Sequence, residues 1–314
     1  MASISLASDG NTPSPAISLR GVSKQFNDFK AVDNVSLDIE RGEIFGLIGH
    51  NGAGKSTLFK MMLGLIPLSC GTIRITGEEV NGPKAREIRR HIGYLPENVV
   101  LYDNLDGLET LKFFAKLKDA PQSQCAEILR KVGLAHAGKR PVRAYSKGMR
   151  QRLGFAQALL GSPRVLFLDE PTNGLDPMAI REFYATLRTL QDGGVTVIIT
   201  SHILAELQER VDRLAILTAG QIQALGTVQE LRDQLHMPLT LEVDLDAADA
   251  PRVAAQIMQV TGIEAQVSAR GLRLKCDRSH KVAVLGAVTG SNAPIKDIRL
   301  HMPSLEDVFF GLNE

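Results

Sequence analysis

The sequence has 314 residues, of which 44% are hydrophobic and 23% are charged, a balance that is typical of a globular protein and excludes a disordered or fibrous chain. At ~150 residues per domain, this length predicts two domains. The 36 Lys and Arg residues nearly cancel the 35 Asp and Glu residues, and a net charge of +1 excludes a general electrostatic attraction to nucleic acid or anionic lipid.

Residues 1–16 are small and polar, contain two prolines and lack the charged start and apolar run of a signal peptide, so we predict a flexible tail there. The three cysteines are far apart in the sequence. This is against a disulfide framework or a Cys-x-x-Cys metal site, and it favours a reducing cytoplasm. No run of about eighteen apolar residues occurs, so we expect any membrane-spanning part to lie in another chain.

Residues 17–236 alternate short β-branched runs with longer segments of helical period, which predicts an α/β domain with a largely parallel core sheet. The predicted strands are 37–39, 44–47, 73–76, 93–95, 165–168, 195–200, 214–217 and 222–225. Asp106 followed by Glu109 has the spacing of a capping box and predicts a helix through residue 117. The residues expected to face inward on it are Leu108, Leu111, Phe114, Ala115 and Leu117.

Residues 237–314 change to a different order of elements. The predicted order is strand 240–243, helix 252–260, strands 265–268 and 272–276, helix 281–289 and strand 295–300. This order predicts a small α+β domain of the βαββαβ type. Because no catalytic constellation falls within it, an accessory docking or regulatory role is favoured.

A phosphate-binding loop is predicted at residues 49–56, where Gly-His-Asn-Gly-Ala-Gly-Lys-Ser matches GxxxxGK(S/T) between an apolar strand and a helix predicted over 57–65. The glycines allow backbone N–H groups to surround phosphate, Lys55 can reach the β- and γ-phosphates, and Ser56 can ligate Mg²⁺. A chance match is the alternative, which this setting disfavours. The residues predicted to hold nucleotide here are Gly49, Asn51, Gly52, Ala53, Gly54, Lys55, Ser56 and Thr57.

Two carboxylates, Asp169 and Glu170, follow the apolar run 165–168 and would leave the sheet beside this loop. Asp169 can hold Mg²⁺ through water, and Glu170 is positioned to polarise the water that attacks the γ-phosphate. Alone, the pair would more often be a solvated strand end. Together with the loop, the catalytic interpretation is favoured.

Three further motifs occur in a characteristic order. Ser146-Lys147-Gly148 precedes the two carboxylates, Asn-Gly-Leu-Asp at 173–176 follows them, and His202 comes after strand 195–200. With the phosphate-binding loop, this set resembles the ATP-binding subunits of ABC transporters, which implies a P-loop NTPase domain with a helical subdomain at about 98–162. The resemblance covers most of residues 17–310. It implies that Ser146, Gly148 and Asp176 contact nucleotide and that His202 is a switch histidine.

Two positions bear on how closely the chain follows the family. Phe26 falls where the family places an aromatic side chain that stacks on adenine, with packing in the core as the alternative. Residues 93–97 resemble the Q-loop, but Glu97 stands where the family usually has glutamine. As a ligand, Glu97 would bring an extra negative charge close to Mg²⁺ unless its side chain turns outward.

The resemblance implies an ATPase that uses ATP and Mg²⁺, with Glu170, His202 and Lys55 as catalytic residues and Ser56, Asp169 and Glu97 around the metal. The implied partners are a second copy in a head-to-tail homodimer, an integral membrane permease and, through that permease, a periplasmic protein, but no nucleic acid. The implied location is cytoplasmic, on the inner face of the cell membrane. Segment 97–118 is expected to receive a short helix of the permease.

Segments 49–55, 93–117 and 132–160 look like the ATPases of transporters that mature nitrous oxide reductase, a copper enzyme. An exporter of a different substrate remains an alternative. Soluble ABC ATPases in translation or DNA repair and P-loop kinases are others. The chain has neither tandem ATPase domains nor a long coiled-coil insertion, and a kinase would not need the Ser-x-Gly motif.

Overall fold

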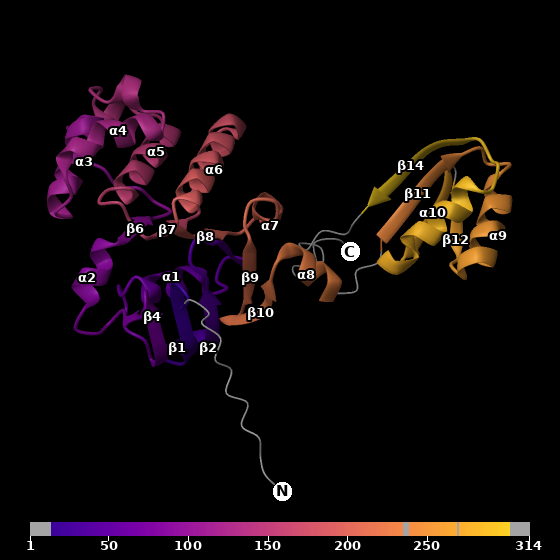
Figure 1. Cartoon of the computed structure of the whole chain (residues 1–314), viewed down its shortest axis with the longest axis horizontal. Helices are drawn as coiled ribbons and strands as arrows, with labels where there is room; N and C mark the ends of the chain where they lie inside the picture. The colour runs from indigo at the N-terminus through magenta and orange to yellow at the C-terminus, as the bar shows by residue number, and fades with distance from the viewer. Residues whose placement is uncertain (1–13, 235–238, 269, 302–314) are drawn as a thin grey trace, which may run out of the picture. The chain divides into compact units, whose positions relative to one another are not determined.

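The computed structural model describes residues 14–234, 239–268 and 270–301, which form two compact units (Figure 1). The first unit ends at Leu225 and the second begins at Gly226. The predicted tail falls mainly on residues 1–13, outside the described part, and the predicted boundary after residue 236 lies beyond helix α8 (Val228–Gln234). No helix in the described ranges is long and apolar enough to cross a bilayer.

The core of the first unit is a six-stranded sheet in the order β10-β9-β3-β8-β7-β6. Its strands are β3 (Ile44–Ile48), β6 (Ile92–Leu95), β7 (Val165–Asp169), β8 (Thr196–Ser201), β9 (Arg213–Thr218) and β10 (Gln221–Gly226). The pairs β3–β8, β3–β9, β6–β7 and β7–β8 are parallel, which confirms the predicted parallel core. Every residue of β3, β7 and β8 is buried, as their continuous apolar runs require.

A second, four-stranded sheet in the order β2-β1-β4-β5 has antiparallel pairs. Its strands are β1 (Ile17–Phe26), β2 (Phe29–Ile39), β4 (Cys70–Ile75) and β5 (Glu78–Glu79). The predicted strands 37–39 and 73–76 overlap only parts of β2 and β4, and neither β1 nor β5 was predicted. The pairing of β1 shifts register on both sides of Val22, and Gly21 has a φ of 56°, so the strand lacks the regular alternation that sequence patterns detect.

The helices of the first unit range from a single turn to the 16 residues of α6 (Pro177–Asp192). They are α1 (Lys55–Met62), α2 (Ala85–Arg90), α3 (Gly107–Leu117), α4 (Cys125–Lys131), α5 (Lys147–Ala158), α6 (Pro177–Asp192) and α7 (Leu204–Leu207), with 3₁₀ turns at Gln122–Gln124, Ala135–Ala137 and Val142–Ala144. The helix predicted over 57–65 runs from Lys55 to Met62, so it begins two residues earlier than expected, within the phosphate-binding loop motif.

The predicted capping box at the start of α3 is confirmed. The Asp106 carboxylate accepts the Glu109 N–H at 2.7 Å, and the Glu109 carboxylate accepts the Asp106 N–H at 2.9 Å. Leu111 and Ala115 are buried as expected. The expectation for Leu117 is wrong: this side chain is 67% exposed, because it lies two residues after Ala115 and so on the opposite side of the helix.

The second unit has the predicted βαββαβ order. Its elements after α8 are β11 (Leu239–Leu245), α9 (Ala250–Thr261), β12 (Ala265–Ser268), β13 (Gly271–Cys276), a 3₁₀ turn at Arg278–His280, α10 (Lys281–Thr289) and β14 (Ile295–His301). The sheet order is β12-β13-β11-β14. Alternate residues of β11 pack with Val253 and Ile257 of α9 and with Val284 and Val288 of α10, and together they form a hydrophobic core within the second unit.

Lys118 connects three elements of the first unit. At the end of α3, its ammonium group donates to the carbonyl of Ile92 in β6 at 2.9 Å and to that of Leu160 after α5 at 2.7 Å. Burial lowers the pKa of Lys118 from 10.5 to about 8. The cost is desolvation of the charge, which two neutral carbonyls only partly offset.

This lowered pKa predicts a stability profile. Between about pH 8 and pH 10 the unfolded chain retains the Lys118 proton that the folded chain has lost, so the free energy of unfolding should rise with pH across this window. Below pH 8 both states keep the Lys118 proton, so this group gives the free energy of unfolding no pH dependence there. We expect the free energy of unfolding of wild type, relative to that of Lys118→Met, to rise from pH 8 to pH 10 when both are measured by denaturant melts at several pH values. A difference that does not change with pH would contradict the prediction. Burial raises the pKa of Tyr94 to about 12, but Tyr94 is present in both proteins, so its titration cancels in the difference.

Candidate nucleotide-binding and catalytic site

The predicted motifs meet at one edge of the core sheet. Strands β3, β8 and β7 are neighbours and run parallel, so their carboxyl ends lie side by side. Ile48 pairs with Ser201 and Asp169 pairs with Thr200, which brings the loop after β3, the carboxylates after β7 and His202 after β8 together. In parallel sheets the ligand site lies at this edge.

The phosphate-binding loop depends on Gly54, the residue before α1. Gly54 has a φ of 104°, and a Cβ atom there would lie 2.4 Å from the carbonyl oxygen of Ala31 in β2. The loop is anchored at Ala53, whose carbonyl accepts the Gly220 N–H at 3.0 Å and whose N–H donates to His50 at 3.1 Å. The first N–H groups of α1 consequently open into the loop, where they favour an anion.

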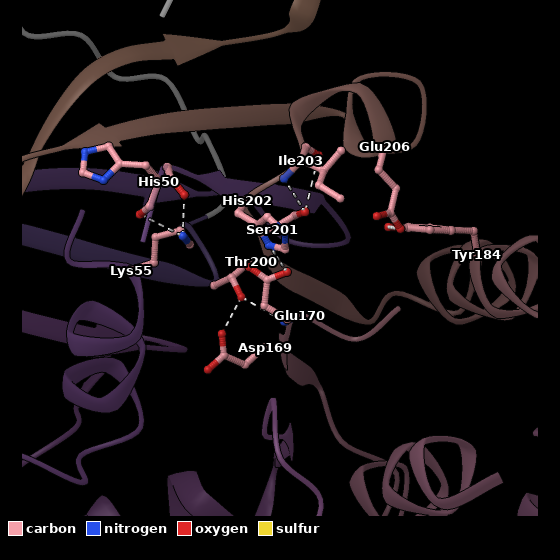
Figure 2. A network of polar contacts seen from close by, with 11 residues as sticks. His50, Lys55, Asp169, Glu170, Tyr184, Thr200, Ser201, His202, Ile203 and Glu206 are labelled. Carbon is pink, nitrogen blue, oxygen red and sulfur yellow. Dashed lines mark hydrogen bonds and ion pairs between the residues drawn. The ribbon is translucent and has the colours of Figure 1, made fainter. Parts of the chain in front are cut away.

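Lys55 directs its ammonium group into the loop, where it donates to the carbonyl oxygens of Gly49 and His50 (Figure 2). The side chain is buried, and burial lowers its pKa, while the charges of Glu170, Asp169 and Glu97 oppose that shift. A buried cation held by neutral carbonyls before the first turn of a helix fits phosphate, because an anion there would restore the charge balance that desolvation disturbs.

The two predicted carboxylate residues are linked through Thr200, and the Glu170 carboxylate also contacts His202 (Figure 2). The Thr200 hydroxyl donates to Asp169 at 2.5 Å and accepts the Glu170 N–H at 3.1 Å, and Glu170 Oε2 lies 2.9 Å from His202 Nδ1. Burial raises the pKa of Glu170, and the neighbouring His202 acts in the opposite direction. A carboxylate with a raised pKa is a better proton acceptor, so this arrangement suits a general base.

Thr200 is a site residue that sequence reasoning missed. As a β-branched residue in an apolar strand it looks like ordinary strand packing. Only the pairing register of β7 with β8 brings it opposite Asp169.

A magnesium ion fits the residues at this edge. Mg²⁺ retains several waters and binds one or two protein groups together with substrate phosphates. Ser56, exposed in the first turn of α1, and Asp169 would supply those two groups. Within the described residues no group of three or more His, Cys, Asp and Glu side chains could hold a metal by itself, so a site of this kind would depend on phosphate.

Glu97 and Phe26 are both exposed at the ends of strands. Glu97 follows β6 and is exposed, but its charge is felt by both Lys55 and Tyr94. Phe26 ends β1 and is 46% exposed, which is against the alternative of core packing. The Lys24 ammonium lies 4.9 Å from the Phe26 ring centroid, so the ring is held but leaves surface for a flat ligand.

The other predicted ligands form a second group. Ser146 caps α5 by accepting the Met149 N–H at 3.2 Å, and Asp176 caps α6 by accepting the Ala179 N–H at 2.8 Å. Both line a groove of about 450 Å³, where a Cβ atom at Gly148 would lie 3.1 Å from the carbonyl oxygen of Gly174. The structure therefore brings Ser146, Gly148 and Asp176 together.

No hydrogen bond in the described part of the chain joins this second group to Lys55, Asp169 or Glu170. The two groups are connected through the backbone: the Asn173 N–H donates to the Glu170 carbonyl at 3.2 Å, and the buried Gln151 of α5 donates to the carbonyl of Pro171 at 3.1 Å. Asn51 and Thr57 remain with the first group, Asn51 exposed in the loop and Thr57 half-buried in α1.

Fold and site together define a P-loop ATPase: a parallel sheet, a glycine-dependent loop before a helix, a buried lysine and two carboxylates at adjacent strand ends. Residues 32–173 match the sequence pattern of the ABC transporter family. A Bacillus subtilis protein named as an uncharacterized ABC transporter ATP-binding protein is 36% identical over 94% of this chain and 95% of its own length. The daunorubicin resistance ATP-binding protein DrrA3 of Streptomyces coeruleorubidus is 34% identical over 95% of each chain.

Solved structures agree with these sequence relatives. The ATP-binding subunit of an ABC transporter superposes with a TM-score of 0.65 and 31% identity, covering 70% of this chain and 93% of the other. A bacterial ABC transporter cassette described as dimeric has the same fold, with a TM-score of 0.63 and 24% identity over 67% of this chain and 98% of its own. The chain belongs to the ATP-binding subunits of ABC transporters, and it binds and hydrolyses ATP.

Proposed function

We propose that this chain is the ATP-hydrolysing subunit of an exporter, that it works as a head-to-tail homodimer, and that it acts from the cytoplasmic side beneath a separate membrane permease. The separation of its site residues into two groups is the observation that carries the proposal. Lys55, Asp169 and Glu170 form one group, whereas Ser146 and Asp176 line a groove of their own. A head-to-tail pair would place the second group of one copy on the nucleotide held by the first group of the other.

Each residue of the first group has a proposed role. The loop and Lys55 hold the β- and γ-phosphates of ATP, and Phe26 stacks on the adenine. Bound Mg²⁺ would neutralise charge on the phosphate oxygens, held by Ser56 and Asp169. Glu170 accepts the proton of the attacking water, and His202 fixes the Glu170 carboxylate through their contact at 2.9 Å. Glu97, exposed after β6, is proposed to adjust the charge around Mg²⁺.

A pair of variants tests the proposed roles. Glu170→Gln keeps the side-chain shape but cannot accept the proton, so we expect ATP binding to remain and hydrolysis to slow by ~10²–10⁴-fold. Lys55→Ala removes the phosphate contact, and we expect ATP binding itself to be lost. Calorimetric binding and phosphate-release assays on the purified chain separate the two effects. Wild-type hydrolysis by Glu170→Gln would remove Glu170 from the role of base.

An exposed apolar patch supports the proposed docking of a permease helix on segment 97–118. Val100 is 86% exposed and Tyr102 55% exposed, and the Tyr102 ring meets Phe113 edge-on at 5.5 Å. Leu117 continues the patch on α3. Val99 is not part of it, because its methyl groups fill the space above Gly154 of α5. An apolar patch of this kind is typical of a groove that receives an amphipathic helix.

Charge substitutions test this patch. Val100→Glu and Tyr102→Glu should weaken co-purification with the permease and abolish transport, because a helix would have to bury an unpaired carboxylate. ATP binding by the isolated subunit should be unchanged, since both side chains are already exposed. Leu65→Glu, at a residue that is 60% exposed outside segment 97–118, is the matched control. Normal transport by both patch variants would contradict the docking proposal.

The names of relatives guide the proposed substrate. Besides DrrA3, the linearmycin resistance ATP-binding protein LnrL of Bacillus subtilis is 31% identical over 93% of this chain and 96% of its own length. These names support export of an antimicrobial compound. The narrower resemblance to NosF, the ATPase for nitrous oxide reductase, rests on sequence segments alone, and we keep copper-enzyme maturation and a periplasmic partner as the second candidate.

Cells that lack the subunit distinguish the two candidates. Export predicts that they become more sensitive to daunorubicin or linearmycin, and that wild-type protein but not Glu170→Gln restores resistance. The maturation candidate predicts unchanged resistance together with nitrous oxide reductase that lacks copper. Dose–response curves and metal analysis of the purified reductase give the answer. Unchanged resistance to both compounds would contradict the export proposal.

A further inference from the structure

The chain makes an unfavourable turn at Glu170, immediately after β7. Glu170 has a φ of 47°, in the left-handed region that side chains other than glycine rarely adopt. Most other non-glycine residues with positive φ in the described part of the chain are Asn, Asp or Ser, whose short side chains tolerate this conformation. Glutamate has no such advantage. Backbone strain of this kind persists only where neighbouring groups hold it in place.

Thr200 supplies a group that holds this turn. Its side chain is fully buried in β8, directly opposite Asp169. A backbone N–H can only donate, so the Thr200 hydroxyl must accept the Glu170 N–H at 3.1 Å. The single hydroxyl proton is then left for Asp169 Oδ1, at 2.5 Å. One hydroxyl therefore fixes the backbone of Glu170 and the carboxylate of Asp169 at once (Figure 2).

Simple packing does not account for a hydroxyl at this position. Thr200 belongs to β8, in which every residue is buried. Valine at this position would have the same shape, the same preference for strands and no polar group to desolvate. A residue required only for packing would be better as valine. The hydroxyl is explained by its two partners, both of which belong to the catalytic edge.

We infer that Thr200 is a positioning residue for ATP hydrolysis, whose hydroxyl aligns the Asp169 carboxylate toward Mg²⁺ and holds Glu170 in the left-handed conformation that directs its side chain to His202. The inference rests on the proposed roles of Asp169 and Glu170. Partners of metal ligands and catalytic groups typically contribute 10–100-fold to metal affinity or activity.

Thr200→Val and Thr200→Ser in the full-length chain test the inference. Without the hydroxyl, we expect kcat to fall by about 10–100-fold and the Mg²⁺ concentration for half-maximal rate to rise by a similar factor, with the KM for ATP at saturating Mg²⁺ unchanged. Binding of Mn²⁺ with ATP, followed by electron paramagnetic resonance, should weaken in parallel without depending on turnover. Thr200→Ser retains the hydroxyl and should restore most of both properties.

Thr196→Val is the matched control. Thr196 is buried in the same strand, and its hydroxyl also accepts a backbone N–H, from Gly42 at 3.0 Å, but it lies at the opposite end of β8. We expect Thr196→Val to lower thermal stability about as much as Thr200→Val while kcat and the Mg²⁺ dependence stay normal.

Several results would overturn the inference: wild-type kinetics in Thr200→Val, equal impairment in Thr200→Ser, or the same Mg²⁺ shift in Thr196→Val. If Thr200→Val does not fold, Thr200→Ala is measured instead. Failure of both to fold, with Thr200→Ser folded, would assign the hydroxyl to stability alone. Glu170→Gln, assayed alongside, distinguishes failure of the proposed base from failure of the inference about Thr200. Normal hydrolysis by Glu170→Gln would show that Glu170 is not the base. Slow hydrolysis by Glu170→Gln together with normal kinetics in Thr200→Val would remove only the role of Thr200.

Discussion

The parallel register of β3, β8 and β7 is the constraint on which the rest of this structure depends. It places Thr200 opposite Asp169 and Ser201 opposite Ile48, so that three loops distant in sequence end at one edge. A slip of one residue would turn buried side chains toward the wrong face and separate the Thr200 hydroxyl from both of its partners. The continuous burial of all three strands holds the register, and the apolar core thereby determines the geometry of the polar site.

Several charged side chains lie at that edge, where they are partly removed from water. Burial disfavours the charged forms of both Lys55 and Glu170, and each is partly compensated by the charge of the other. Asp169 favours the charged form of Lys55 but disfavours that of Glu170. The loop carbonyls give Lys55 hydrogen bonds without an opposing charge. Phosphate would complete this balance, and the free energy that it recovers is available to favour the nucleotide-bound state.

The sequence predicted those features that are determined by residues close to one another along the chain. The loop pattern at residues 49–56, the capping box at Asp106 and the apolar strands all appear in the structure, because each depends on neighbours a few residues away. The course of β1, the exposure of Leu117 and the link through Thr200 depend on partners far along the chain, and single-residue preferences do not encode them. Glu97 belongs to the same class: its motif located it after β6, but only the fold indicates that its charge reaches Lys55.

The proposed head-to-tail homodimer requires that the ATP site be complete only between two copies of the chain. Sedimentation velocity of the full-length Glu170→Gln protein tests it directly, because this variant should retain ATP without consuming it. We predict the mass of a monomer without nucleotide or with ADP, and the mass of a dimer with Mg²⁺ and ATP. A protein that binds ATP yet remains monomeric, or one that is equally dimeric without nucleotide, would contradict the claim.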